Sequence, residues 1–242
     1  MIPTIEGLID RRILINYRVE KEVLERFLPE LFKPKLVEGY GVAGICLIRL
    51  KQIRPKGLPG FLGISSENGA HRIAVEWEDN GTKEGVYVYR RDTSARLNTL
   101  VGGRLFPGVH HYSKFTSVEE NGNYQVNFAN KDGTYISIEG TETDIFPSTS
   151  LFRNVQEAST FFEKGSLGYS PQRNNRRYDG LELRTLTWNV KPLGVSEVRS
   201  SFFEDESIFP KGSIQFDNAL LMKDIKHQWH SAKDICVENF EK

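Results

Sequence analysis

Two adjacent histidines are the residues best suited to chemistry in this sequence. His110 and His111 follow the loop 105–109 and open a segment of strand-like composition. An imidazole titrates near neutral pH, so it could act as a general acid, a general base or a metal ligand. Side chains alternate along a strand, so only one of the two can face an interior. The alternative is a structural pair, with one histidine hydrogen-bonded inside and the other on the surface.

Arginines in the same stretch are candidates for binding an anion. Arg90, Arg91 and Arg104 all precede the histidine pair. In a closed cavity, a guanidinium would bind a carboxylate or a phosphate through two parallel hydrogen bonds. Arg91 could instead pair with its neighbour Asp92 and only fix the local turn. We take Arg104 as a catalytic candidate and Arg91 as a ligand-binding candidate.

The dipeptide Asn80-Gly81 predicts a hairpin with a two-residue turn, since both positions favour positive φ. In that register Val75 opposes Val86, and their face of the hairpin is apolar. The opposite face would meet either solvent or a polar cavity, and it carries Arg72, Ala74, Glu76, Tyr87, Tyr89 and Arg91. From this face Glu76 is a further catalytic candidate, and the two tyrosines are ligand-binding candidates.

Three other polar patterns have competing explanations. Glu182 and Arg184 share a strand face, either on a pocket wall or on an outer surface, and both are ligand-binding candidates. The pair His227 and His230 could bind a metal from a helix, but a strand would send them to opposite faces, so no metal site is expected. A basic loop contains Arg173, Arg176 and Arg177. These side chains are expected to be solvated rather than to bind an anion.

Recurrent turn signals indicate that these residues are positioned by many short strands. Asn121-Gly122 and Asp132-Gly133 resemble the first turn, and each separates segments rich in β-branched and aromatic residues. Such a pattern is typical of a barrel or sandwich rather than of alternating strands and helices. Strands are expected over residues 72–77, 86–89, 124–128, 135–138, 181–190, 195–203, 213–222 and 225–229.

Two amphipathic segments predict helices. Residues 20–28 place their apolar side chains on one stripe and end at a proline. Residues 154–164 do the same, with Asn154 as the N-cap and Gly165 at the end. Residues 94–101 are a candidate for a short third helix. The polar residues 165–180 are expected to form a long loop.

Composition limits the classes of partner. The chain has 242 residues, with 32 Lys+Arg and 32 Asp+Glu, so its formal net charge is zero. This excludes nucleic acid or an anionic membrane as the main partner, because both require a basic excess. Of the two cysteines, Cys46 lies in an apolar run and is expected to be a buried, inert thiol. Without a secretory signal or an apolar run of spanning length, a cytoplasmic location is expected.

The segment 85–115 carries a resemblance to a known family. It reads GVYVYRRDTSARLNTLVGGRLFPGVHHYSKF, which resembles the acetoacetate decarboxylase superfamily and, more closely, its uncharacterised branch, the domain-of-unknown-function 2071 family. Further segments fit that branch in the same order, at residues 13–50, 66–79 (SENGAHRIAVEWED), 161–171 (FFEKGSLGYSP), 178–188 (YDGLELRTLTW) and 200–222. The resemblance implies a mainly β fold over a single domain, 1–242: a closed antiparallel β-barrel with two or three short flanking helices and an interior pocket.

One departure from the decarboxylases bears on chemistry. In those enzymes a Gly-Arg-Glu stretch leads through an aromatic-rich loop to Pro-Lys-Lys, whose first lysine forms a Schiff base with the keto acid. Gly103-Arg104 matches the start of that pattern, but His110 and His111 replace the lysine pair. An imidazole cannot form a stable imine with a ketone, and Lys114 lies beyond the pair. The sequence therefore argues against Schiff-base decarboxylation, and a lyase acting on a keto acid is kept as the alternative.

Two functions of different class remain open. The first is an enzyme in which His110 or His111 moves protons and Arg104 or Arg91 holds an anionic group. The second is a module that binds a small organic acid or another anionic metabolite without turnover. A purely structural role ranks third. No cofactor, metal, nucleic acid or membrane partner is expected, and a homo-oligomer is compatible with the sequence.

Overall fold

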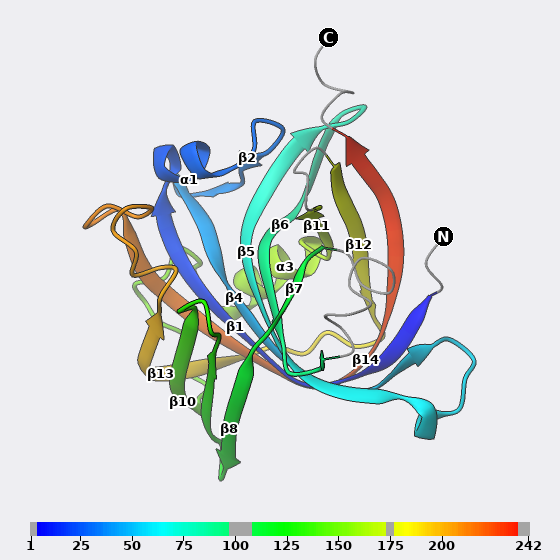
Figure 1. The fold of residues 1–242 in the computed structure, drawn as a ribbon. Helices are drawn as coiled ribbons and strands as arrows, with labels where there is room; N and C mark the ends of the chain where they lie inside the picture. Colours follow the sequence, from blue (N-terminus) through cyan, green and yellow to red (C-terminus); the bar gives the residue numbers. More distant parts are fainter. Residues whose placement is uncertain (1–3, 97–107, 173–176, 237–242) are drawn as a thin grey trace.

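The computed structural model describes residues 4–96, 108–172 and 177–236, and the chain is mainly β (Figure 1). The helical elements are α1 (Lys21–Phe27), the 3-10 turn η1 (Gly60–Leu62) and α3 (Val155–Lys164). The strands are β1 (Ile5–Glu20), β2 (Lys33–Pro34), β3 (Leu36–Val37), β4 (Tyr40–Pro55), β5 (Ile64–Glu78), β6 (Thr82–Thr93), β7 (His110–Tyr112), β8 (Lys114–Glu120), β9 (Asn123–Ala129), β10 (Tyr135–Glu142), β11 (Leu167–Pro171), β12 (Arg177–Thr185), β13 (Lys191–Ser200) and β14 (Ile214–Cys236).

Seven of these strands form a continuous path of paired neighbours, which we call the strand ring. The path runs β1-β4-β5-β6-β11-β12-β14, and β14 pairs again with β1. Only the β6–β11 step of this path is parallel. The strands β13, β10, β9 and β8 continue from β14 as a second antiparallel layer, drawn at the left of Figure 1. The short strand β7 adds to β6 in parallel.

The strand ring separates two sets of buried side chains. On its outer face, residues such as Ile13, Ile45 and Ile73 form the main core with the second layer and α1. On its inner face, residues such as Leu14 pack against Phe162 of α3, which lies within the ring (Figure 1). Side chains alternate along each strand, so they point in turn to the outer face of the ring, which forms the main core, and to its inner face.

Both predicted helices are confirmed. Asn154 caps α3, since its Oδ1 accepts a hydrogen bond from the backbone N–H of Glu157 at 2.9 Å. Most of the candidate helix 94–101 lies outside the described residues. The predicted loop 165–180 is wrong: residues 167–171 and 177–185 are paired strands. Tyr169 and Tyr178 bury their side chains there, and that burial outweighs the polar composition.

The first hairpin differs from its prediction by one residue. Glu78 pairs with Thr82, so the turn has three residues, with Asn80 at φ 52° and Gly81 at φ 108°. Val75 consequently pairs with Gly85 instead of Val86. A slip of one residue sends every side chain of one strand to the other face. The turn at 121–122 does have the expected two-residue form, because Glu120 pairs with Asn123.

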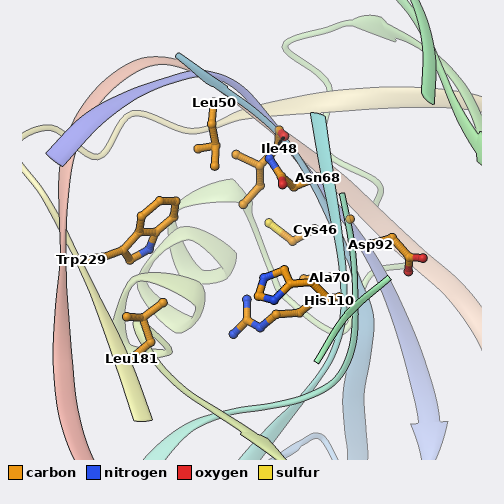
Figure 2. Close-up of a pocket in the computed structure, with 11 residues that line it drawn as sticks. Cys46, Ile48, Leu50, Asn68, Ala70, Asp92, His110, Leu181 and Trp229 are labelled. Carbon is orange, nitrogen blue, oxygen red and sulfur yellow. Dashed lines mark hydrogen bonds between the residues drawn. The ribbon is translucent and has the colours of Figure 1, made fainter. Parts of the chain in front are cut away.

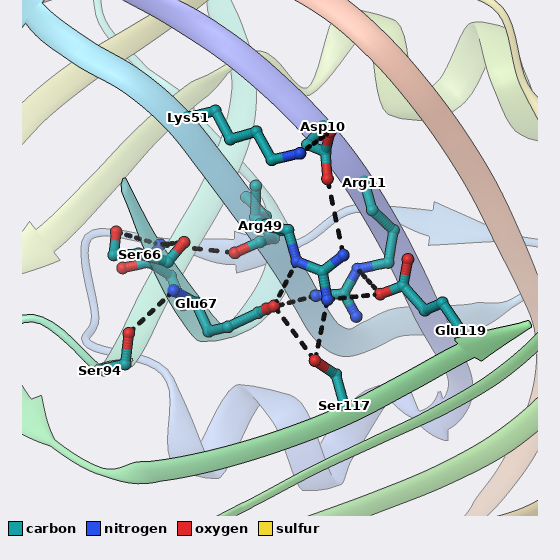
Figure 3. A network of polar contacts seen from close by, with 11 residues as sticks. Asp10, Arg11, Arg49, Lys51, Ser66, Glu67, Ser94, Ser117 and Glu119 are labelled. Carbon is teal, nitrogen blue, oxygen red and sulfur yellow. Dashed lines mark hydrogen bonds and ion pairs between the residues drawn. The ribbon is translucent and has the colours of Figure 1, made fainter. Parts of the chain in front are cut away.

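A polar network joins the strand ring to the second layer (Figure 3). A register shift after Ile9 turns Arg11 of β1 to the outer face, where it is 1% exposed. Arg11 pairs there with Glu67 of β5 and Glu119 of β8. Arg49 of β4 binds the same two carboxylates, at 2.6 Å and 2.7 Å. The two arginines and two glutamates thus link the strand ring to the second layer through ion pairs.

No helix in the described ranges has the length and apolar character needed to cross a membrane.

Candidate functional site

One row of paired residues crosses the inner face of the strand ring. Leu14 of β1 pairs with Cys46 of β4, and Cys46 pairs with Ala70 of β5. Ala70 pairs with Arg91 of β6, and Arg91 pairs with His110 of β7. Because paired residues on adjacent strands point to the same side of a sheet, the row presents a thiol, a guanidinium and an imidazole to the interior. The small Ala70 separates Cys46 from Arg91 and leaves room in front of them.

A cavity lies in front of this row (Figure 2). Its far wall comes from Leu181 of β12 and Trp229 of β14, on the opposite side of the strand ring. The space at its centre is about 60 Å³, room for a few water molecules or a compact ligand. The lining residues are Cys46, Ile48, Leu50, Asn68, Gly69, Ala70, Arg91, Asp92, His110, Leu181 and Trp229.

The two neighbouring histidines face opposite sides, as strand alternation requires. His110 lines the inner cavity. His111 lines a cleft on the outer face, together with Tyr87 and Tyr89. Burial, with a further contribution from the cation of Arg91, lowers the pKa of His110 to about 4. At neutral pH His110 is therefore an uncharged imidazole, able to accept a proton.

Arg91 is the cationic group on the cavity wall. Its Nε donates a hydrogen bond to Ser170 Oγ at 3.1 Å. Burial lowers the pKa of Arg91 to about 10, which leaves it charged at neutral pH. The local pair with Asp92 considered above does not form: Asp92 binds Arg90 at 2.8 Å and Ser113 at 2.7 Å. In Figure 2 the Asp92 carboxylate points away from the cavity.

Two further arginines lie on the inner face beside this row. Arg12 donates from Nε to Cys46 Sγ at 3.1 Å, and its guanidinium lies 5.5 Å from the Trp188 ring. Arg72 lies over the Phe162 ring at 4.7 Å, and burial lowers its pKa to about 10. Within the described residues, neither these two arginines nor Arg91 forms an ion pair with a carboxylate. The carboxylate of Asp179 is close enough to Arg91 to act on it electrostatically, and this interaction raises the pKa of Arg91 against the effect of burial.

Several predicted site residues lie away from this cavity. The register slip places Tyr87 on the outer face opposite Ile73, and Tyr89 is exposed and stacked on Phe202. The two tyrosines therefore lie on the opposite face of β6 from the inner row, although Arg91 also lines the cleft that contains them and His111. Glu76 pairs with Lys33 and is not among the described residues that line the cavity.

The remaining candidates divide between the outer surface and the undescribed segments. Glu182 and Arg184 form an exposed ion pair at 2.7 Å on the outer face of β12, because Leu181 occupies the inner face. They therefore lie on the outer surface, one of the two positions that the sequence left open, and do not line the cavity. Arg104 lies outside the described residues, as do Arg173 and Arg176.

The other histidines are placed as structural residues. His227 is 2% exposed and packs on Trp229 with ring centroids 4.4 Å apart, whereas His230 hydrogen-bonds Gln228 at 3.2 Å. His71 is fully buried among aromatic rings of the outer core. Among the described residues, no group of three or more His, Cys, Asp or Glu side chains could hold a metal ion.

Sequence analysis missed Cys46 and Arg12 beside this cavity, and it named Arg72 only as part of a hairpin face that could meet a polar cavity. Cys46 is buried as expected, but it also lines the cavity. The signal that could have identified the arginines is a charged residue next to or inside a run of apolar strand residues, as Arg12 before residues 13–15 and Arg72 within residues 70–75. A charge on a strand that is buried on both faces needs a partner, so it marks a polar interior.

The fold is similar to those of several solved structures. An acetoacetate decarboxylase from Legionella pneumophila subsp. pneumophila str. Philadelphia 1 has a TM-score of 0.64 and 9% identity, covering 96% of this chain and 88% of that chain. An acetoacetate decarboxylase-like enzyme from Sphingomonas wittichii RW1 has a TM-score of 0.62 and 11% identity, covering 97% and 93%. The enduracididine biosynthesis enzyme MppR, complexed with pyruvate, has a TM-score of 0.55 and 11% identity, covering 100% and 93%. At these identities the similarity shows a shared fold.

Curated protein sequences include no match to this chain. A family model does match, over residues 9–214, which is most of the chain. The family is described as an uncharacterized conserved protein. The match shows that this chain belongs to the DUF2071 family.

Proposed function

We propose that the strand ring works as a closed barrel whose inner cavity binds a small organic anion, with His110 exchanging a proton with that ligand. The observation that carries this proposal is the positive charge of Arg12, Arg72 and Arg91, none of which forms an ion pair with a carboxylate of the described residues. A buried cation that lacks an ion pair is costly, so a bound carboxylate would stabilise this part of the interior. Pyruvate, the ligand of one structural neighbour, is an anion of this kind.

The lining residues give each part of the ligand a different environment. Arg91 would bind the carboxylate through two N–H groups, since only its Nε is engaged by Ser170. The opposite wall is apolar, formed by Leu181 and Trp229 with Leu50 beside them. His110 is uncharged near neutral pH and lies next to Arg91, so it would take a proton from the bound acid and release it again. The chemistry this supports is acid–base chemistry on a compact carboxylate.

Replacing Arg91 with glutamine tests the binding role. Thermal shift against acetate, propionate and pyruvate should identify at least one carboxylate that raises the melting temperature of the wild-type protein, because a ligand that binds only the folded state stabilises it. In Arg91→Gln the affinity for that carboxylate should fall at least tenfold, about 1.4 kcal/mol. Arg184→Gln removes an exposed arginine of the outer face and should bind like wild type.

Proton exchange gives this test a second readout. If pyruvate is the carboxylate that binds, NMR in D2O should show deuterium replacing its methyl hydrogens in the presence of wild-type protein, because the adjacent ketone carbonyl makes them acidic. His110→Ala should abolish that exchange, whereas His111→Ala, one residue away on the opposite face, should retain it. If no carboxylate raises the melting temperature, or if Arg91→Gln binds with full affinity, the proposed function is wrong.

The second candidate function, Schiff-base chemistry on a keto acid, is disfavoured by the absence of an amine. No lysine is among the described residues that line the cavity, and residues 97–107 and 173–176 contain none. Lys114 lies in β8 of the second layer, where it is exposed.

We therefore expect borohydride reduction in the presence of acetoacetate or pyruvate to leave no covalent adduct on the protein. An imine requires a primary amine close to the bound carbonyl, and catalysis is sensitive to displacements of about 1 Å. Mass spectrometry of the intact protein measures the outcome. A reduced adduct on Lys114 that Lys114→Ala removes would restore the decarboxylase mechanism.

A further inference from the structure

Cys46 is the one sulfur atom on the described wall of the inner cavity. Its side chain is 3% exposed, yet it lines the cavity, and Figure 2 shows the sulfur directed toward the open space. The neighbouring position in its row is Ala70, whose methyl group covers little of the sulfur. A compact molecule inside the cavity would therefore meet the thiol directly.

Three arginines lie around Cys46 on the inner face of the strand ring. Arg12 Nε donates to Sγ at 3.1 Å, and a charged donor binds a thiolate more strongly than a thiol. Arg72 lies diagonally across from Cys46 on the inner face, since Gly44 is its partner on β4. Arg91 occupies the same row as Cys46, two strands away. Thiolates are stabilised by cations of this kind, and cysteines that have them are the reactive ones.

An independent feature of this part of the interior is a set of buried N–H donors. Arg72 is 5% exposed, and its Nη2 donates to Asn16 Oδ1, but its Nε and Nη1 have no hydrogen-bond partner among the described residues. Nη1 of Arg12 is also buried without a partner in the described part of the chain. Buried N–H donors that lack an acceptor are rare in folded proteins, so they call for an anionic acceptor or for water.

We propose that Cys46 is a nucleophile of the inner cavity, able to bond covalently with a small anionic carbon electrophile that Arg91 holds. This proposal rests on the proposed function for the anion site. In the reaction, the thiolate sulfur attacks the carbon that bears a leaving group and forms a C–S bond. The bond from carbon to the leaving group breaks, and the leaving group departs with its electron pair. If Cys46 begins as a thiol, its proton passes to the solvent or to His110.

Iodoacetate and iodoacetamide test the proposal, because they differ only in the charge of the group beside the reactive carbon. Each native protein is treated with one reagent at neutral pH, and peptide mass spectrometry measures the alkylation rates of both cysteines. Cys236, on β14 and partly exposed, is the internal reference. The ratio of the iodoacetate rate to the iodoacetamide rate should be at least tenfold higher at Cys46 than at Cys236. Arg91→Gln should bring the two ratios together.

Two results would overturn the proposal. One is a Cys46 that neither reagent modifies while Cys236 reacts. The other is a ratio of iodoacetate to iodoacetamide rates that is the same at Cys46 and Cys236. That result would show that Arg91 does not hold an anionic electrophile next to Cys46. The variant Cys46→Ser tests whether the anion site binds carboxylates independently of the cysteine. If thermal shift with carboxylates persists in Cys46→Ser although wild-type Cys46 is unreactive, the anion site stands and only the nucleophile is excluded.

Discussion

Replacing Arg11 with alanine is expected to lower the free energy of unfolding by about 3–5 kcal/mol, as measured by urea denaturation followed by tryptophan fluorescence. Arg11 is 1% exposed and pairs with Glu67 and Glu119. Its removal leaves both carboxylates with Arg49 as their shared remaining arginine, and opens a hole between the layers. Burial lowers the pKa of Arg11 although both carboxylates raise it, so the effect of burial outweighs that of pairing at this side chain.

Two further variants identify the origin of that loss. Arg11→Met keeps an unbranched apolar stem in place, so it should recover part of the packing but not the ion pairs. Arg184→Ala breaks an exposed pair with Glu182 and should cost less than about 1 kcal/mol. If Arg11→Ala costs no more than Arg184→Ala, the network of Figure 3 does not hold the two layers together.

Local sequence patterns predicted part of the fold but not the pairing of the first hairpin. They predicted both helices and strands within β5, β6, β9, β10, β12, β13 and β14, and Asn154 and Gly165 marked the ends of α3. The long strands β1 and β4 were not predicted, and β11 lies where a loop was expected. The dipeptide Asn80-Gly81 fits both a two-residue and a three-residue turn, because positive φ at these positions suits either form. The choice depends on which face of β6 packs against the core, a contact with distant strands that local residues do not encode.

The same limit explains which part of the site could be predicted. His110 and Arg91 lie near each other in sequence and pair directly, so one stretch of chain carried that signal. The far wall comes from Leu181 and Trp229, on strands more than seventy residues away. Cys46 looked like a core residue because its neighbours in sequence are apolar. Only the register of β4 against β5 places it beside the cavity.

Three histidines share an environment that opposes their charged form. Burial lowers the pKa of His71, His110 and His227 to about 4 in each case. An ordinary histidine in the unfolded chain has a pKa of about 6.5. Between these values the unfolded chain binds protons that the folded protein does not, so protonation favours unfolding. Stability is therefore unaffected by these groups above about pH 6.5 and falls as the pH drops toward 4.

The expected result is acid unfolding before pH 4, with a steep loss of stability that begins near pH 6.5. Each of these histidines contributes up to about 1.4 kcal/mol per pH unit within that interval. The three groups together can remove up to about 10 kcal/mol between pH 6.5 and 4, which suffices to unfold a domain in the lower part of the usual range of about 5–15 kcal/mol. Urea denaturation at a series of pH values from 8 to 4 measures the slope, and NMR titration of the imidazole signals measures the pKa values in the folded protein.

His71→Phe isolates one of the three contributions. The aromatic rings of Phe128 and Phe202 surround His71, so phenylalanine is the closest apolar replacement for the imidazole. Any packing cost of the substitution is independent of pH, whereas the proton-linked penalty disappears. The variant should therefore gain stability relative to wild type as the pH falls from 6.5 to 4, whatever its stability at pH 8. Parallel stability curves for the two proteins would show that His71 is protonated equally in the folded and unfolded states.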